Sequence, residues 1–470
     1  MASDNMQRHI PDRPKMTVIG TGYLGATHAV SMASLGFDVM GVDVDPGKIE
    51  KLAAGEVPFF EPGLPELLEE QLASGRLRFT TSFEEAAHFG DVHFVCVGTP
   101  QRKDGRGADL TYVEQAVSAL AQHADRQALV IGKSTVPVGT AEKLTMLVDS
   151  ITREPGVLEI AWNPEFLREG YAVEDTLHPD RLVFGVESAW AERMLRAVYA
   201  PVIDQGVPVV VADLPTAELV KVAANSYLAT KISYINAMAE VCEASGADVQ
   251  VLSEALGYDN RIGSLFLKPG LGFGGGCLPK DIRAFTARAE ELGVGQAVEF
   301  LHQVDGINNR RRQRTVDLVS ELLDGALPGA RVVCLGATFK PNSDDVRDAP
   351  ALDVARRLEE AGADVVVFDP EGMDNARRTH PQLTYSATFA ESLKDADAVV
   401  LLTEWDKFKN ADPEMMGELV RRRIVVDGRH ALDADAYHRA GWVYRALGRP
   451  ADVHSQMARQ DALDKELSSV

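Results

Sequence analysis

Two stretches of alternating strand and helix signals, separated by one long helical segment, restrict this 470-residue chain to few architectures. In the first stretch, short apolar runs rich in β-branched residues recur at 16–19, 39–42, 92–97, 128–131, 158–161, 182–184 and 207–211. These runs are apolar throughout, which is typical of strands covered on both faces. Segments of helical period lie between them, and this order predicts a parallel sheet with helices on both sides.

The second stretch repeats the pattern after a helical middle. Residues 214–245 read as one helix, with Pro215 in its first turn and Gly246 at its end. More helical sequence runs from 284 to 323, broken near Gly293. Strands are then expected at 332–335, 365–368, 398–402, 424–426 and 442–444. The predicted fold class is α/β, with two Rossmann-like doubly wound sheet domains joined by a long central helix and a helical dimerisation region.

The length also indicates several domains, because a single core stops growing near roughly 250–300 residues. We place the first sheet domain at 15–212, the central helical domain at 213–325 and the second sheet domain at 326–448. The polar ends, 1–14 and 449–470, are expected to be flexible.

Composition excludes other classes of protein. The net charge of −22 opposes binding to nucleic acid, whose phosphates repel an acidic surface. No apolar run approaches the roughly 18–20 residues of a membrane-spanning helix, and the polar start lacks a signal peptide. The four cysteines form no Cys-x-x-Cys pair, which fits a reducing compartment and gives no metal signature. We therefore expect a cytoplasmic protein with no metal, no nucleic acid and no membrane partner.

Residues 20–25, Gly-Thr-Gly-Tyr-Leu-Gly, follow the first predicted strand and open a helix. In such a turn Gly20 permits the tight bend, Gly22 lets the backbone approach a pyrophosphate, and Gly25 lets helix pack on strand. Asp43 ends the next strand, where a carboxylate accepts hydrogen bonds from the adenosine ribose and repels a 2′-phosphate. The sequence therefore predicts an NAD site that includes Tyr23 and Leu24 of the turn.

Polar residues at the ends of later strands extend this site. Loops at the carboxyl ends of parallel strands line the ligand crevice. We expect the hydroxyl groups there to donate to cofactor or substrate, and Lys48 to offset the charge of the diphosphate. The residues in these loops are Thr99, Pro100, Ser134 and Thr135.

The segment 266–281 carries the strongest chemical signal. Five glycines between Gly270 and Gly276 strip side chains from one loop, so its N–H groups can reach an anion. Cys277 follows directly, where a helix is expected to start. A helix N-terminus with Lys280 nearby lowers the pKa of a thiol and supplies thiolate. The other three cysteines lie in apolar runs and are expected to be buried.

A nucleophilic cysteine beside an NAD site narrows the chemistry. A thiolate is useful when an aldehyde must become an acid, because the thiohemiacetal loses hydride and the resulting thioester is hydrolysed. On the central helix, Lys221 and Asn225 share one face, where they can stabilise an alkoxide or a water. Glu165 is a candidate general base, and it shares a face with Glu169 if that segment is helical. The alternatives are an exposed lysine with a capping asparagine, and two glutamates facing a helix dipole.

Taken together, these residues resemble the UDP-glucose/GDP-mannose dehydrogenase family over nearly the whole chain, 15–447. The motifs that carry the resemblance are GTGYLG, FFEPGL, KSTVPVGT, NPEFLREG, HPDRLVFG, ELVKVAANSYLATKISYIN, FLKPGLGFGGGCLPKD, ATFKPNSDDVRD and VVDGRHALD. The resemblance implies two successive oxidations at C6 of a sugar nucleotide with two NAD and one water. The implied substrate is UDP-glucose, which becomes UDP-glucuronate for polysaccharide biosynthesis.

Site roles follow from the resemblance residue by residue. The implied catalytic residues are Cys277 as nucleophile, Lys221, Asn225 and Asp281 as oxyanion and water-handling groups, Glu165 as acid/base, and Thr135. The implied NAD contacts beyond the turn are Glu169, Lys280 and Arg347. The implied substrate contacts are Glu165, Phe166, Leu167, Lys221, Asn225, Lys268, Phe273, Gly274, Phe339, Lys340 and Arg429. Arg261 resembles an arginine contributed from a neighbouring subunit, which implies a homodimer or higher homo-oligomer.

Three alternatives remain open. GDP-mannose is a possible substrate because its dehydrogenases share the CLPKD sequence. A two-electron β-hydroxyacid dehydrogenase shares the sheet-plus-long-helix plan, but it needs neither Cys277 nor a second sheet domain. An NAD-binding sensor without turnover leaves the cysteine loop unexplained.

Overall fold

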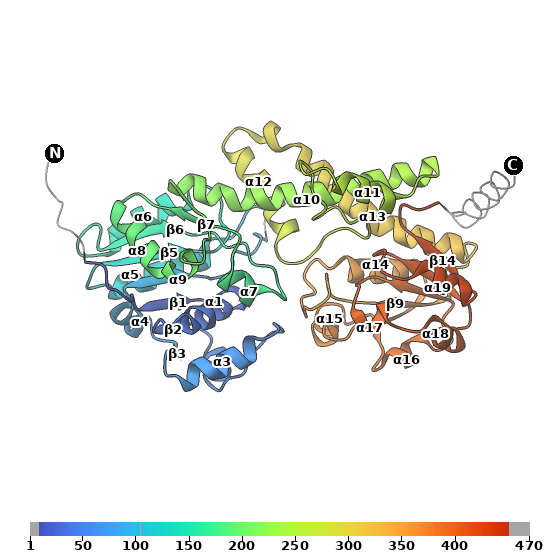
Figure 1. The fold of residues 1–470 in the computed structure, drawn as a ribbon, viewed down its shortest axis with the longest axis horizontal. Helices are drawn as coiled ribbons and strands as arrows, with labels where there is room; N and C mark the ends of the chain where they lie inside the picture. Colours follow the sequence, from blue (N-terminus) through green and yellow to red (C-terminus); the bar gives the residue numbers. More distant parts are fainter. Residues whose placement is uncertain (1–8, 104, 451–470) are drawn as a thin grey trace. The chain divides into compact units, whose positions relative to one another are not determined.

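The computed structural model describes residues 9–103 and 105–450 (Figure 1). The chain divides into two compact units. Unit 1 holds residues up to Asn225 together with 280–297, and unit 2 holds 226–279 together with the chain from Val298 onward. The proposed three-domain boundaries stay a prediction, because these two units divide the chain inside helices.

Unit 1 is built on an eight-stranded sheet of order β3-β2-β1-β4-β5-β6-β7-β8. Its strands are β1 Met16–Ile19, β2 Val39–Val42, β3 Leu77–Thr80, β4 Val92–Val95, β5 Ala128–Gly132, β6 Leu158–Trp162, β7 Leu182–Gly185 and β8 Val209–Ala212. Neighbouring strands from β3 to β6 run parallel, and so do β7 and β8. The β6–β7 pair is antiparallel through a single residue pair, Trp162 and Gly185, a local departure from the predicted parallel sheet.

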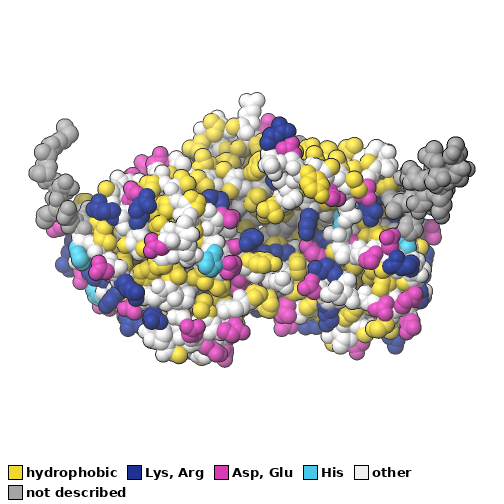
Figure 2. Space-filling model, viewed as in Figure 1, with side chains coloured by type: hydrophobic (Ala, Val, Ile, Leu, Met, Phe, Trp, Pro, Cys, Tyr) yellow, Lys and Arg dark blue, Asp and Glu magenta, His cyan; other side chains and the backbone are white. Residues whose placement is uncertain are grey.

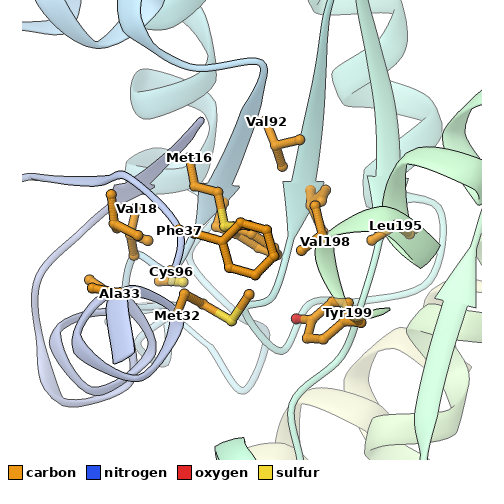
Figure 3. Packing of buried hydrophobic residues seen from close by; sticks show 14 of the residues in the cluster. Met16, Val18, Met32, Ala33, Phe37, Val92, Cys96, Leu195, Val198 and Tyr199 are labelled. Carbon is orange, nitrogen blue, oxygen red and sulfur yellow. The ribbon is translucent and has the colours of Figure 1, made fainter. Parts of the chain in front are cut away.

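Both faces of the central strands of this sheet are buried, as their uniformly apolar sequence predicted, whereas the edge strand β8 is partly exposed. Met16 and Val18 of β1 join one core cluster with α1 and α8, whereas Ile19 joins the other with α5 and α6. Figure 3 shows part of the first cluster. The helices whose bounds lie within this unit are α1 Tyr23–Ser34, α2 Pro46–Ala53, α3 Leu64–Ala73, α4 Phe83–Phe89, α5 Thr111–His123, α6 Thr140–Ile151, α7 Ala172–Leu177, α8 Ala189–Val198 and α9 Ala200–Ile203.

Helices form the central part of the chain. α10 Leu214–Ser245 has the predicted bounds and contributes residues to both units. It is followed by α11 Val249–Gly257, α12 Leu278–Glu291, the 3₁₀ helix η1 Gly295–Val298 and α13 Phe300–Leu322. The break near Gly293 is confirmed: Gly293 has φ of +76°, which ends the helical path after α12. Within the described residues, no helix is both long and apolar enough to cross a bilayer.

Unit 2 contains the second sheet, of order β11-β10-β9-β12-β13-β14, with every pair parallel. Its strands are β9 Arg331–Leu335, β10 Asp364–Phe368, β11 Thr384–Tyr385, β12 Ala398–Leu401, β13 Ile424–Asp427 and β14 Val443–Ala446. Its remaining helices are α14 Pro350–Glu360, α15 Met373–Thr379, α16 Phe389–Leu393, α17 Asp406–Lys409, α18 Pro413–Leu419 and α19 Ala434–Arg439. The predicted fold class, two Rossmann-like sheets joined through a long helix, is confirmed.

Most of the two predicted flexible ends falls outside the described residues. Within the described part, Ile10 packs against the first core cluster and the Arg13 guanidinium donates to the carbonyl of Gly36 at 3.2 Å. Arg449 pairs with Asp248 at 2.8 Å. These contacts attach residues next to both ends to the folded units.

Candidate active site

The glycine-rich turn joins β1 to α1 as predicted. Gly20 has φ of +89° and its N–H donates to the carbonyl of Val42 at 2.7 Å. A Cβ added to Gly25 would lie 1.8 Å from the carbonyl oxygen of Gly20, so no side chain fits there. A Cβ on Gly22 would meet no protein atom within 4 Å. Gly22 therefore leaves open space before the N-terminus of α1, where the turn fits the diphosphate of NAD.

Gly22→Ala separates cofactor binding from folding. The backbone of Gly22 has φ of −72°, which alanine adopts without strain, and the new methyl group meets no protein atom. We expect unchanged thermal unfolding without cofactor and NAD affinity reduced at least roughly tenfold, measured by calorimetric titration. Gly25→Ala is the comparison, because its clash with Gly20 should lower the melting temperature. Wild-type NAD affinity in Gly22→Ala would contradict the assignment of the turn.

Asp43 lies directly after β2, at the predicted ribose position. Its Oδ2 accepts from the N–H of Thr21 at 2.8 Å and pairs with the Lys48 ammonium at 2.7 Å. Burial acts to raise the pKa of Asp43, but Lys48 and the N–H groups of Asp45 and Thr21 outweigh it and hold this pKa below its ordinary value. The carboxylate is thus ionised and able to accept hydrogen bonds. Lys48, predicted to offset the diphosphate charge, pairs with Asp43 in this structure.

The loops after β4 and β5 bind each other through their hydroxyl groups. Thr99 Oγ1 donates to the carbonyl of Thr135 at 2.8 Å, and Ser134 Oγ donates to the carbonyl of Val97 at 2.6 Å. The Lys280 ammonium lies 3.4 Å from Thr99 Oγ1. The Thr99 and Ser134 hydroxyls were predicted to donate to a ligand, but here their protons go to neighbouring carbonyl groups.

Glu61 is a buried carboxylate to which sequence reasoning gave no role of its own. It is 3% exposed, and it accepts from the N–H groups of Gly170 and Ala172 at 2.7 Å each and from the Tyr23 hydroxyl. Burial, followed by the hydrogen bond to Glu61, raises the pKa of Tyr23. Tyr23 is the first residue of α1. The hydrogen bonds of Glu61 therefore connect the cofactor turn to the end of the 163–171 segment.

That segment is irregular, so Glu165 and Glu169 do not share a helix face, and the helical alternative is wrong. Glu165 Oε1 lies 2.9 Å from the ammonium of Lys221, and its Oε2 accepts from the N–H of Leu167 at 2.7 Å. The Phe166 ring lies 5.6 Å from the same ammonium. Lys221 is 5% exposed, so the alternative of an exposed surface lysine is also wrong.

Asn225 and Asp281 form a second buried pair. Asn225 Nδ2 donates to Asp281 Oδ2 at 2.6 Å, and the Lys280 ammonium lies 2.8 Å from Asp281 Oδ1. Asn225 follows Lys221 by one helical turn on α10, so both point from one face. Glu165, Lys221, Asn225 and Asp281 all belong to unit 1.

Lys133, the first residue after β5, is a buried cation to which sequence reasoning gave no role. Its ammonium donates to Asn163 Oδ1 at 2.9 Å and to the Tyr199 hydroxyl at 3.1 Å. Burial lowers the pKa of Lys133 to about 8. The only sequence signal was a lysine that directly follows an apolar strand.

This depressed pKa predicts how stability depends on pH. In the unfolded chain Lys133 keeps its proton up to about pH 10.5, so between pH 8 and 10.5 the unfolded state binds more protons. Its contribution to the unfolding free energy therefore rises with pH, by up to about 3 kcal/mol. Urea unfolding of wild type and Lys133→Met at pH 7.5 and 10 measures it. A difference between the two proteins that stays constant with pH would contradict the assignment.

Cys277 is exposed and directly precedes α12, whereas Cys96, Cys242 and Cys334 are buried, as the sequence predicted. Asp281 lies in the first turn of α12. Cys277 itself belongs to unit 2, with the glycine loop before it.

The glycines of that loop pack closely against their neighbours, and the predicted anion cradle stays a prediction. A Cβ on Gly272 would lie 2.2 Å from Asn308 Oδ1, and one on Gly276 would lie 2.3 Å from the Arg347 guanidinium. The N–H groups of Gly270 and Gly275 donate to Asn236 Oδ1 and to the carbonyl of Arg347, at 2.9 Å each. Close packing within unit 2 thus requires glycine at 272 and 276, and the N–H groups of Gly270 and Gly275 are occupied.

Asn308 holds the middle of the loop from α13. Its Oδ1 accepts from the N–H of Phe273 at 2.8 Å, and its Nδ2 donates to the carbonyl of Phe273 at 2.9 Å. Phe273 and Gly274, predicted to contact substrate, are buried. Lys268 of the same loop is exposed.

The remaining predicted contacts of unit 2 differ in their surroundings. Arg429 is half-buried and donates to the carbonyls of Leu402 and Gly272, at 2.7 and 3.0 Å. The Phe339 ring packs against Gly275, with the Lys340 ammonium 5.3 Å from its centre. Arg347 pairs with Asp345 at 2.6 Å.

Comparison with known proteins covers nearly the whole chain. The NAD binding domain of the UDP-glucose/GDP-mannose dehydrogenase family matches residues 14–203, its central domain matches 215–310, and its UDP binding domain matches 333–434. The chain is 40% identical over 438 residues to a UDP-glucose 6-dehydrogenase of Rhizobium meliloti (strain 1021), covering 93% of this chain and all of that protein. It is 39% identical over 441 residues to the UDP-glucose 6-dehydrogenase YwqF of Bacillus subtilis (strain 168), covering 94% and 99%.

Solved structures agree with this relationship. A UDP-glucose dehydrogenase from Pyrobaculum islandicum superposes with a TM-score of 0.85 at 38% identity, covering 95% of this chain and all of that one. A GDP-mannose dehydrogenase from Pseudomonas aeruginosa has a TM-score of 0.51 at 26% identity, covering 92% and 99%. Sequence, domain order and fold agree, and the chain therefore belongs to the UDP-glucose/GDP-mannose dehydrogenase family and is an NAD-dependent oxidoreductase.

Proposed function

We propose that this enzyme oxidises UDP-glucose to UDP-glucuronate in two steps through a covalent intermediate on Cys277. The observation that carries the proposal is the exposed Cys277 at the start of the helix whose first turn holds Asp281. The relatives named as UDP-glucose 6-dehydrogenases match this chain along almost all of their own length, which supports the substrate. When bound in unit 1, NAD accepts the hydride that leaves C6 in each oxidation.

The first oxidation converts the C6 alcohol into an aldehyde. The alcohol loses its hydroxyl proton and a hydride, so negative charge develops on the oxygen before the carbonyl forms. We assign Lys221 to stabilise that oxygen. Its ammonium is buried, and exclusion of water strengthens the attraction between the ammonium and a negatively charged oxygen. Glu165, paired with Lys221 at 2.9 Å, balances the charge of the ammonium when substrate is absent.

The second oxidation uses the thiolate of Cys277. A new C–S bond forms at C6, the carbonyl oxygen becomes the oxyanion of a thiohemiacetal, and loss of a second hydride leaves a thioester. Asn225 is assigned to hydrogen-bond this oxyanion or the water, with its amide oriented by Asp281 at 2.6 Å. Thr135 is assigned to the same reacting region.

Hydrolysis of the thioester completes the reaction. Glu165 accepts a proton from water, whose oxygen attacks the thioester carbonyl, and the C–S bond breaks to return the Cys277 thiolate. One alcohol and one water thus give one carboxylate, two hydrides and three protons.

We further propose that residues 15–212 bind NAD, that 213–325 carry the cysteine loop, and that 326–448 bind the sugar nucleotide. Within unit 1, the NAD contacts are assigned to the turn 20–25, Asp43, Lys48, Thr99, Pro100, Ser134, Glu169 and Lys280. Arg347 of unit 2 is assigned to the same cofactor. The substrate contacts are assigned to Phe166, Leu167, Lys268, Phe273, Gly274, Phe339, Lys340 and Arg429.

We propose a homodimer or a larger homo-oligomer that works in the cytoplasm. On α10, Tyr227, Tyr234 and Val241 are each more than half exposed and recur every seven residues, which gives a stripe of apolar surface. Figure 2 shows hydrophobic side chains at the surface over these central helices. Arg261, 88% exposed in its side chain and paired with Asp259, is assigned to a neighbouring subunit's site.

Turnover of two sugar nucleotides tests the substrate assignment. Purified enzyme with NAD should oxidise UDP-glucose with a kcat/KM at least roughly 100-fold above that for GDP-mannose, since each polar group of the site that the wrong substrate leaves unpaired costs about 1–3 kcal/mol. NADH absorbance gives both values. A higher kcat/KM for GDP-mannose would contradict UDP-glucose as the substrate, while the proposed type of reaction would still stand.

A further inference from the structure

Lys133 lies inside unit 1 without a carboxylate partner. Its side chain is 7% exposed, and within residues 9–103 and 105–450 no acidic group lies at ion-pair distance from it. Its ammonium instead contacts Asn163 Oδ1 and the Tyr199 hydroxyl, and lies 5.7 Å from the ring centres of Phe94 and Tyr199. Tyr199 packs in the core cluster with Cys96 and Val198 (Figure 3). A buried cation held only by neutral groups costs folding free energy and gains no ion pair in return.

Asn163 connects this cation to the catalytic segment. It directly follows β6, is 1% exposed, and its N–H donates to the carbonyl of Gly132 at 2.9 Å. Its Nδ2 donates to the carbonyl of Val183 at 2.9 Å, and its Oδ1 also accepts from the Tyr199 hydroxyl at 2.6 Å. The N–H, Nδ2 and Oδ1 of Asn163 are thus all held by hydrogen bonds. Glu165 lies only two residues further along the chain. The start of the segment that carries Glu165 is therefore set by the contacts of Asn163.

We propose that Lys133 is a positioning residue for thioester hydrolysis: its buried ammonium orients Asn163 and, through it, the segment that carries Glu165. This inference rests on the proposed role of Glu165 as the base. Lys133 acts through other residues and is not assigned a contact with substrate or cofactor.

Several titratable groups surround the Lys133 ammonium. Glu165 and Lys221 both interact electrostatically with Lys133. Burial raises the pKa of Cys96 to about 12 and raises that of Tyr199, so both are neutral at pH 7. Burial, and then the charge of Lys133, lowers the pKa of His28 from α1, so this imidazole is neutral as well.

Two buried ammonium groups, Lys133 and Lys221, interact with the Glu165 carboxylate, and the neighbouring Lys280–Asp281 pair adds no net charge. An excess positive charge in a poorly solvated region stabilises the oxyanion that forms on the thioester. Loss of the Lys133 charge should therefore slow hydrolysis, with less effect on substrate binding.

The first test compares wild type with Lys133→Met, which keeps length and apolar volume but removes the charge. Asn163 Oδ1 retains the Tyr199 hydroxyl as donor, so the fold should tolerate the change. We expect kcat for UDP-glucose to fall roughly tenfold or more and KM to change less than about threefold. Stopped-flow absorbance should show a burst of NADH before slow steady-state turnover. Lys143→Met, on the exposed face of α6, is the control and should match wild type.

A purely structural role predicts a different result. It would lower the melting temperature of Lys133→Met and change kcat and KM together without a burst of NADH, and this outcome would overturn the proposal. Wild-type kcat in Lys133→Met would overturn it as well. If that variant does not fold, Tyr199→Phe removes one hydrogen bond to the same ammonium and should shift kcat in the same direction; unchanged kcat there would overturn the proposal.

The wild-type product separates this inference from the proposed function. If wild type forms only an aldehyde and one NADH, the proposed hydrolysis fails and this inference fails with it. If wild type forms UDP-glucuronate with two NADH and Lys133→Met does the same at the same rate and pH, the inference alone fails.

Discussion

Cys277→Ser is expected to abolish formation of the acid, with kcat reduced by roughly 10⁴ or more. A serine hydroxyl stays protonated near neutral pH, so it adds poorly to an aldehyde, and its ester would be a poorer acyl donor than a thioester. UDP-glucose should still bind, because the substitution changes one exposed atom. Coupled measurement of NADH and UDP-glucuronate gives the rate.

Cys334→Ala is the matched control. Cys334 lies in β9 inside the second core, where burial raises the pKa of its thiol to about 12, so it supplies no thiolate. The control should lose a little stability and keep wild-type kcat. Acid formation at the wild-type rate by Cys277→Ser would contradict the assignment of the nucleophile.

Lys221→Met is expected to lower kcat by roughly 10³, because it removes the buried positive charge assigned to the developing alkoxide. It also leaves Glu165 without its partner at 2.9 Å, so the unfolding free energy should fall by about 1–3 kcal/mol. Steady-state kinetics and urea unfolding of the same preparation measure both effects.

The double variant Lys221→Met/Glu165→Gln separates the two effects. It removes both charges, so stability should return most of the way to wild type while kcat stays low. Because Glu165 is also the assigned base, the double variant tests only the stability effect, and stability that does not recover would contradict the ion pair. Wild-type kcat in the single variant Lys221→Met would contradict the catalytic role of Lys221.

The fold followed from sequence where strands were covered on both faces. β1 and β2 have the predicted bounds because each is apolar along its whole length. β3 was missed because it lies at the sheet edge, where Arg78 and Thr80 alternate with apolar residues and only Leu77 is buried. β11, also an edge strand, is only two residues long and gives no periodic signal.

In the candidate site, features set by nearby sequence could be predicted, whereas contacts between residues far apart in the chain could not. The exposure of Cys277 and the shared face of Lys221 and Asn225 depend on nearby sequence, and pattern predicts them. Glu61 and Lys133 act through partners 30 or more residues away, which no spacing rule joins. The close packing of the glycine loop on Asn308 could not be predicted, because this neighbour in unit 2 is not apparent in the sequence.

Oxidation of UDP-glucose by wild type in ¹⁸O-labelled water tests the central claim most directly. NADH absorbance and mass spectrometry of the product together count the hydrides removed and the oxygen gained. The covalent mechanism on Cys277 predicts two NADH per UDP-glucose and one ¹⁸O in the C6 carboxylate of UDP-glucuronate with wild type, and no UDP-glucuronate with Cys277→Ser. One NADH per UDP-glucose, with an aldehyde or ketone as the final product, would contradict it.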